Sequence, residues 1–269
     1  MTTQFFCPRW GSESIDWRPF CEKVKAAGYH GIEYAIPHTA TDRELEKAWN
    51  SAEKSHLLLL PQHYDTVTAD YYWHLEAFHQ WLERISVYPS VKINSQTGKD
   101  FFSFSQNQQL IELGNRFGVL HETHRGKFSF AAHITETFLQ KIPALRLTLD
   151  VSHWICVAES LLDDQPRPMK LAIERTGHIH ARVGYTEGPQ VSDPRAPEWQ
   201  DTLSRHQHWW DQVVALVISR NQPLTITPEF GPFPYMVHQP ATGRPLASQW
   251  EINLYMMEML RSRYSNADR

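Results

Sequence analysis

The chain has 269 residues, of which 41% are hydrophobic and 21% charged, an ordinary composition for a folded protein that argues against extended disorder. A formal net charge of −4 provides no basic footprint for a phosphate backbone, so we expect no nucleic-acid partner. The three cysteines, Cys7, Cys21 and Cys156, are odd in number and widely spaced, which argues against a disulfide framework or a zinc ribbon.

The chain carries neither of the two usual membrane-directing patterns. No window approaches about 18 uninterrupted apolar residues, the length that a membrane-spanning helix requires. Polar and charged side chains are scattered through the first 20 residues, which is unlike a signal peptide. With unpaired cysteines that suit a reducing compartment, the sequence predicts a soluble cytoplasmic protein without a membrane partner.

Short β-branched or aromatic runs alternate with longer helical patterns along the whole chain. The predicted strands are Gln4 to Cys7, Gly31 to Ala35, Leu57 to Gln62, Val91 to Asn94, Gly118 to Glu122, Leu145 to Asp150, His178 to Val183 and Leu224 to Glu229. The predicted helices are Asp16 to Ala27, Thr41 to Ser55, Ala69 to Val87, Ser105 to Phe117, Ala132 to Lys141, Pro168 to Arg175, Trp199 to Arg220 and Ser248 to Arg261.

Eight such units without a compositional break predict an α/β fold, a single (β/α)₈ TIM barrel. We expect the barrel domain to cover residues 1–264, and residues 265–269 to form a frayed C-terminal tail. Gly28 predicts the end of the first helix, and Thr41 followed by Glu44 predicts a capping box for the second. The long connection from Gly184 to Glu198 is typical of a functional or disordered loop.

In such a barrel the carboxyl ends of the strands face the active site. The polar residues at these predicted ends are almost all metal ligands or acid–base groups: Glu33, His63, Asn94, Gln96, His121, Glu122, His124, Asp150, His153, His178, His180, Arg182 and Glu229.

Each candidate also has an ordinary structural interpretation. Glu122 could cap the next helix or pair with Arg125. Asp150 has a histidine, His153, three residues on, a recurrent way to bring a carboxylate and an imidazole to one centre, but it could equally N-cap a loop helix. Glu229 could pair with a neighbouring strand, and Gly231 after it lets the chain turn sharply.

His178 and His180 alternate along one strand and so share a face. One of them can bind a metal at the barrel mouth, while the other lies deeper as a hydrogen-bonded core histidine. Three carboxylates and a histidine at four neighbouring strand ends predict a bound cation, because burying unpaired negative charges is very costly. Oxygen ligands with one imidazole favour Mn²⁺, Mg²⁺, Co²⁺ or Zn²⁺, and the sequence does not choose among them.

Five segments together resemble a known family across essentially the whole chain. They are Gly28-Tyr-His-Gly-Ile-Glu33, His121-Glu-Thr-His124, Asp150-Val-Ser-His153, Gly177-His-Ile-His180 and Pro228-Glu-Phe-Gly231. On these segments the chain resembles the xylose isomerase-like barrels, specifically the sugar phosphate isomerase/epimerase family of ketose 3-epimerases, hydroxypyruvate isomerases and inosose dehydratases.

The resemblance implies one divalent metal ion held by Glu122, Asp150, His180 and Glu229. It also implies that the two glutamates exchange the proton on opposite faces of the substrate and that His153 touches a substrate oxygen. The chemistry agrees, since a metal that polarises a carbonyl stabilises the enediolate left when an adjacent proton is removed.

The chain departs from the ketose 3-epimerases at two positions. Phe128 and Thr186 stand where those enzymes carry a Glu and an Arg, so a ketohexose substrate is not implied. Arg182 and Arg125 could instead grip a carboxylate or phosphate of the substrate, or form surface ion pairs. His63 and Trp154 complete the predicted substrate-binding residues, with core packing as the alternative for the tryptophan.

The sequence therefore predicts a metal-dependent isomerase or epimerase of a small sugar or related polyhydroxy carbonyl compound. The alternatives are an inosose-type dehydratase, a barrel that binds metal and sugar without turnover, and a three-zinc endonuclease. The endonuclease needs additional metal ligands, and the segments Asn94-Ser-Gln96 and Asp193-Pro-Arg195 do not supply them. A homodimer is a further option, because Trp209, Trp210, Tyr255 and Met256 could form a dimer patch or pack helices on the barrel.

Overall fold

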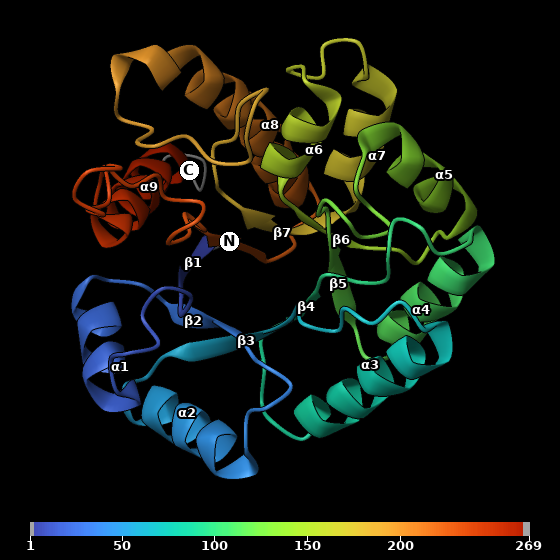
Figure 1. The fold of residues 1–269 in the computed structure, drawn as a ribbon, viewed down its shortest axis with the longest axis horizontal. Coiled ribbons are helices and arrows are strands. Elements are labelled where there is room, and N and C mark those ends of the chain that lie inside the picture. The colour runs from blue at the N-terminus through green and yellow to red at the C-terminus, as the bar shows by residue number, and fades with distance from the viewer. Residues whose placement is uncertain (1–2, 266–269) are drawn as a thin grey trace.

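The computed structural model describes residues 3–265 as a closed barrel of eight parallel strands, with the helices outside it (Figure 1). The strands are β1 (Thr3–Pro8), β2 (Gly31–Ala35), β3 (Leu58–His63), β4 (Ile93–Ser95), β5 (Val119–Glu122), β6 (Leu147–Leu149), β7 (Thr176–His180) and β8 (Leu224–Thr227). The predicted single (β/α)₈ barrel is confirmed. Of the predicted C-terminal tail, residues 266–269 lie outside the described residues.

The helices follow the strands in the predicted order, with two short additions. They are α1 (Trp17–Ala26), α2 (Asp42–Lys54), α3 (Tyr71–Ser86), α4 (Phe104–Arg116), α5 (Ala132–Lys141), α6 (Val151–Ala158), α7 (Pro166–Arg175), the 3₁₀ turn η1 (Pro197–Trp199), α8 (Gln200–Ser219) and α9 (Gln249–Tyr264). None of these helices is long and apolar enough to cross a bilayer.

Local sequence signals account for several helix ends. The capping box predicted at Thr41 and Glu44 is present at the start of α2. Gly28 has a φ of 84° just beyond the end of α1, a left-handed conformation that glycine adopts without strain. Ser103 and Gln106 form a second capping box, so α4 begins at Phe104, one residue before the predicted start.

Three of the four strands next to the candidate ligands end earlier than predicted, while β5 ends at Glu122 as expected. β6 ends at Leu149, β7 at His180 and β8 at Thr227, so the residues that follow leave the hydrogen-bonded ladder at the rim. Asp150 is the N-cap of α6, and its side chain accepts a hydrogen bond from the Ser152 amide at 3.0 Å. The sequence left this cap open as an alternative, because α6 is short and too apolar to show an amphipathic period.

The aromatic residues considered for a dimer patch pack within the chain. Trp209, Trp210 and Met256 are buried in the core, and Tyr255 packs against the same core while partly exposed. Packing of α8 and α9 on the barrel is therefore the correct alternative for this set, and these side chains form no exposed patch.

Gly231 is required by close packing against Trp10, and not by the sharp turn that the sequence suggested. A Cβ at this position would overlap the ring of Trp10, and the backbone does not require a positive φ. The long loop after β7 also holds this glycine, since the Gln190 side chain accepts from the Gly231 amide at 2.7 Å and donates to its carbonyl at 3.2 Å. The segment after β8 is thus fixed from two sides, and with it Glu229.

We predict that Gly231→Ala lowers the free energy of unfolding by about 1–3 kcal/mol, because the added methyl group overpacks the contact with Trp10. Urea denaturation measures this loss. In the double variant with Trp10→Ala the penalty of the glycine substitution should shrink, whereas strictly additive effects would contradict the proposed contact.

Candidate metal centre

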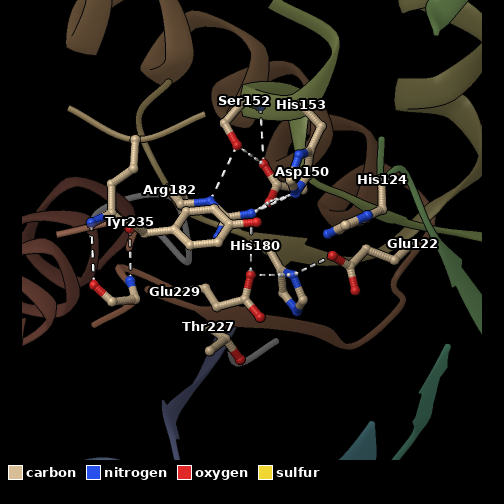
Figure 2. Close-up of polar contacts among 12 residues, drawn as sticks. Glu122, His124, Asp150, Ser152, His153, His180, Arg182, Thr227, Glu229 and Tyr235 are labelled. Atoms are coloured by element: carbon tan, nitrogen blue, oxygen red, sulfur yellow. Dashed lines mark hydrogen bonds and ion pairs between the residues drawn. The ribbon is translucent and has the colours of Figure 1, made fainter. Parts of the chain in front are cut away.

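The structure brings four predicted ligands to one point at the rim of the barrel (Figure 2). Glu122 ends β5, Asp150 follows β6, His180 ends β7 and Glu229 follows β8. All four side chains are buried, and one ligand atom from each lies within 4.8 Å of the others. Consecutive parallel strands end at the same edge of a barrel, which explains why residues so distant in sequence meet.

The imidazole of His180 is held from behind by Glu33, which lies on β2. His180 Nε2 donates to Glu33 Oε1 at 3.0 Å. The other ring nitrogen, Nδ1, lies 2.9 Å from Glu229 Oε2 and 3.6 Å from Glu122 Oε1, yet it has no partner in hydrogen-bonding geometry within residues 3–265. Nδ1 therefore faces the centre of the cluster.

Neutral donors hold one oxygen of each carboxylate and leave the other turned inward. The Gln62 amide donates to Glu122 Oε2 at 3.0 Å and to Glu229 Oε1 at 3.4 Å. The amide and hydroxyl of Ser152 both donate to Asp150 Oδ1. Glu122 Oε1, Asp150 Oδ2 and Glu229 Oε2 face the centre, an arrangement that suits cation binding. The Gln96 amide also donates to Glu122 Oε1, at 3.4 Å.

Arg182 supplies the positive charge nearest to these inner oxygens. Its Nη2 donates to Asp150 Oδ2, lies 3.6 Å from Glu229 Oε2 and donates to His153 Nε2 at 2.7 Å (Figure 2). Burial alone would lower the pKa of this guanidinium, but Asp150 raises it above its usual value. The sequence allowed a surface ion pair for Arg182, but its ion pair with Asp150 is fully buried.

The charges of the cluster perturb one another strongly. Burial alone would raise the pKa of Glu122, but His180 lowers it to about 2. Burial raises the pKa of Glu229, and the nearby His180 only partly opposes this. For His180 burial would lower the pKa, but Glu229 and the other carboxylates around it hold the pKa well above its usual value.

These residues fit a divalent cation. Glu33, Glu122, Asp150 and Glu229 are all buried, and within the described residues Arg182 supplies the positive charge beside Asp150 and Glu229. His180 Nδ1 lacks a hydrogen-bond partner in the described part of the chain and points at inward carboxylate oxygens. Metal-binding histidines usually donate their other N–H to a carboxylate, as His180 does to Glu33.

His178 occupies the deeper position expected for one of the two histidines. Its Nδ1 contacts the Thr225 carbonyl at 2.9 Å, and its Nε2 lies 3.2 Å from Glu33 Oε2. Glu33, His178 and His180 are also close enough to hold an ion, but these contacts already engage both nitrogens of His178. His178 is therefore a hydrogen-bonded core residue.

A cavity of about 570 Å³ opens beside the centre. Its walls are formed by Arg9, Trp10, Glu13, Trp17, Tyr34, Ala35, Pro37, Glu44, Gln62, Tyr64, Gln96, His124, Arg182, Glu229 and Tyr235. Glu229 is the one of the four candidate ligands that reaches the wall of this cavity in the described structure. The other three lie behind it.

Two predicted substrate-binding residues lie away from the cavity. His63 is buried between Phe78 and Trp81 and its ring contacts the hydroxyls of Ser95 and Thr66. Trp154 is completely buried, and its indole N–H donates to a backbone carbonyl at 2.7 Å. Core packing, the alternative given for the tryptophan, therefore describes both side chains, and neither lines the cavity in the described structure.

Two other predicted substrate-binding residues, His153 and Arg125, lie closer to the cavity. His153 is buried and its ring packs against His124, with 3.9 Å between centroids. Arg125 is half-buried and donates to the Tyr235 hydroxyl at 3.2 Å, so it reaches the cavity wall through that tyrosine.

Sequence reasoning gave no role to several residues that organise the centre. Glu33 and Asn94 were noticed at strand ends, but the Asn94 amide proves to bridge Glu33 and Glu122 at 3.1 and 3.3 Å. Gln62 and Arg9 follow the same rule, since both lie at the carboxyl ends of strands. A systematic list of every polar strand-end residue would have included them, although not their partners.

Comparison with known proteins supports the architecture. No protein-family model and no curated protein sequence matches the chain. Among solved structures it is similar to AsfvAP:AG, with 11% identity, coverage of 97% of this chain and 99% of that one, and a TM-score of 0.58. It is also similar to mannonate dehydratase from Streptococcus suis serotype 2, with 10% identity, coverage of 100% and 95%, and a TM-score of 0.56. At such identities these likenesses show the fold alone.

We predict that Glu33→Gln weakens divalent-metal binding by roughly 10- to 100-fold, because it removes the carboxylate that orients His180. Calorimetric titration of chelator-treated protein with Mn²⁺ measures the effect. Glu46→Gln on the exposed side of α2 is the matched control and should leave affinity unchanged. Equal affinities of wild type and Glu33→Gln would contradict this role.

Proposed function

We propose that the protein is a divalent-metal-dependent isomerase or epimerase of a sugar or related polyhydroxy carbonyl compound, akin to the sugar phosphate isomerase/epimerase family. The observation that carries the proposal is the convergence of Glu122, Asp150, His180 Nδ1 and Glu229 beside a cavity of about 570 Å³. That volume is within the usual range for small-molecule sites. A divalent ion held by these four residues would supply Lewis-acid polarisation of the substrate carbonyl.

Glu229 is the group best placed to move the proton. It lines the cavity, and burial raises the pKa of its carboxyl group, which brings it closer to the range useful for a general base. We infer that Glu229 takes the proton from the carbon next to the carbonyl and returns it to the substrate.

Glu122, the second predicted catalytic residue, is better suited to holding the cation. It is completely buried and receives hydrogen bonds from the amides of Gln62, Asn94 and Gln96. Its pKa of about 2 makes it a weak base. Of the two predicted catalytic glutamates, Glu229 alone lines the cavity in the described structure, which favours proton return on the same face, as in isomerisation, over the two-faced exchange of an epimerase.

The alternative functions differ from the proposal in what happens to the substrate proton. Loss of water after that step would make the protein a dehydratase. A barrel that only binds metal and sugar would exchange no proton. The three-zinc endonuclease requires three metal ions per chain, so the measured metal content separates it from the proposal.

The experiment is proton exchange in D₂O with Mn²⁺-loaded protein and a panel of ketoses and inososes, followed by NMR. We expect deuterium at the carbon next to the carbonyl, and a loss of about 100-fold or more in Glu229→Gln, the range typical of a missing general base. Metal content is measured in the same samples, and Glu251→Gln on α9 is the control.

Exchange that survives chelation, or that is unchanged in a metal-loaded Glu229→Gln variant, would contradict the proposal. Release of water with formation of a deoxy product would identify the dehydratase instead.

A further inference from the structure

Arg9, directly after β1, is a buried cation that the proposed reaction does not use. It is 6% exposed and lies on the wall of the cavity. Its Nη2 donates to the carbonyls of Glu13 and Ile15 in the loop that follows. Its Nη1 has no hydrogen-bond partner, and the guanidinium forms no ion pair with a carboxylate, within residues 3–265.

Two aromatic rings hold the guanidinium in place. The Cζ atom lies 4.4 Å from the ring centroid of Phe20 and 4.7 Å from that of Trp17. An arginine keeps its charge in proteins, and a buried charge without a counterion is unfavourable. The position of Arg9 is therefore fixed, and no carboxylate of the described residues forms an ion pair with it.

Neighbouring acids form no ion pair with this guanidinium in the described residues; burial lowers the pKa of Arg9, and the charge of Glu13 only partly opposes this. Glu13 accepts from the Gly11 amide at 3.0 Å with both carboxylate oxygens. Glu44 caps α2, accepting from the Thr41 amide at 2.7 Å and from its hydroxyl at 2.8 Å. Both glutamates line the same cavity as Arg9.

The charges around Arg9 favour a carboxylate over a phosphate as its ligand. No lysine is among the cavity-lining side chains of the described structure, and Glu13 and Glu44 add negative charge there. A phosphate carries about −1.5 to −2 charges at neutral pH and is usually met by several cations or donors. Of the two guanidinium groups that line the cavity in the described structure, Arg182 is paired with Asp150, which leaves Arg9 for a ligand. One guanidinium suits the single charge and planar shape of a carboxylate.

We propose that Arg9 binds a carboxylate group of the substrate, so that the substrate is a sugar acid and neither a neutral nor a phosphorylated sugar. The identification of this ligand as the substrate rests on the proposed function, but the binding itself does not. Arg9 and Glu229 line the same cavity, so a ligand bound at Arg9 lies in the cavity that Glu229 faces.

The test measures binding to chelator-treated protein with three probes: glucuronate, its neutral amide glucuronamide, and glucose 6-phosphate. Trp10 and Trp17 line the cavity, so their fluorescence, together with calorimetry, reports binding. We expect glucuronate to bind about tenfold or more tightly than the other two, the value of a hydrogen bond to a charged group.

Arg9→Met keeps the aliphatic packing and should abolish this preference, while Arg18→Met on the exposed side of α1 should retain it. Equal affinity of wild type for the acid and its amide overturns the proposal, and this comparison needs no variant. Tighter binding of the phosphate, an unchanged preference in folded Arg9→Met, or no binding of glucuronate at millimolar concentration also overturns it. A carboxylate preference without metal-dependent proton exchange would reject the proposed function alone.

Discussion

The burial of several carboxylates at one end of the barrel is the constraint on which the site depends. Glu122, Asp150 and Glu229 have oxygens within 4.8 Å of one another, Glu33 lies behind His180, and all four have almost no access to water. Such an arrangement is unfavourable unless cations and hydrogen-bond donors compensate it. Arg182 and the histidines supply part of that compensation, and the inward-facing oxygens leave room for a divalent ion to supply the rest.

Burial and the charge of His180 explain how one cluster can have two kinds of carboxylate. Burial would raise the pKa of Glu122, but His180 keeps this group strongly acidic, whereas burial raises the pKa of Glu229 at the cavity wall. The fixed segment around Gly231 holds Glu229 in this position through Gln190. A rigid ligand and a more basic wall residue are thus produced from the same side-chain type by environment alone.

The strand and helix alternation was sufficient to predict the barrel, since each unit repeats one amphipathic pattern. The strand-end rule and the grouping of carboxylates pointed to Glu122, Asp150, Glu229 and one of two histidines. The choice of His180 came from the family resemblance. What the sequence could not show is side-chain pairing between distant strands. The ion pair of Arg182 with Asp150 depends on rotamers and packing, and no local pattern encodes it. The same limit applied to the N-cap role of Asp150, which sequence left as one of two options.

The central claim is that Glu122, Asp150, His180 and Glu229 together bind one divalent ion. The most direct test is a crystal structure of Mn²⁺-soaked protein with anomalous scattering data. The account predicts a single strong anomalous peak in contact with His180 Nδ1 and the inner oxygens of the three carboxylates. An absent peak, with Arg182 still paired to Asp150 and His180 Nδ1 still facing Glu229, would contradict it.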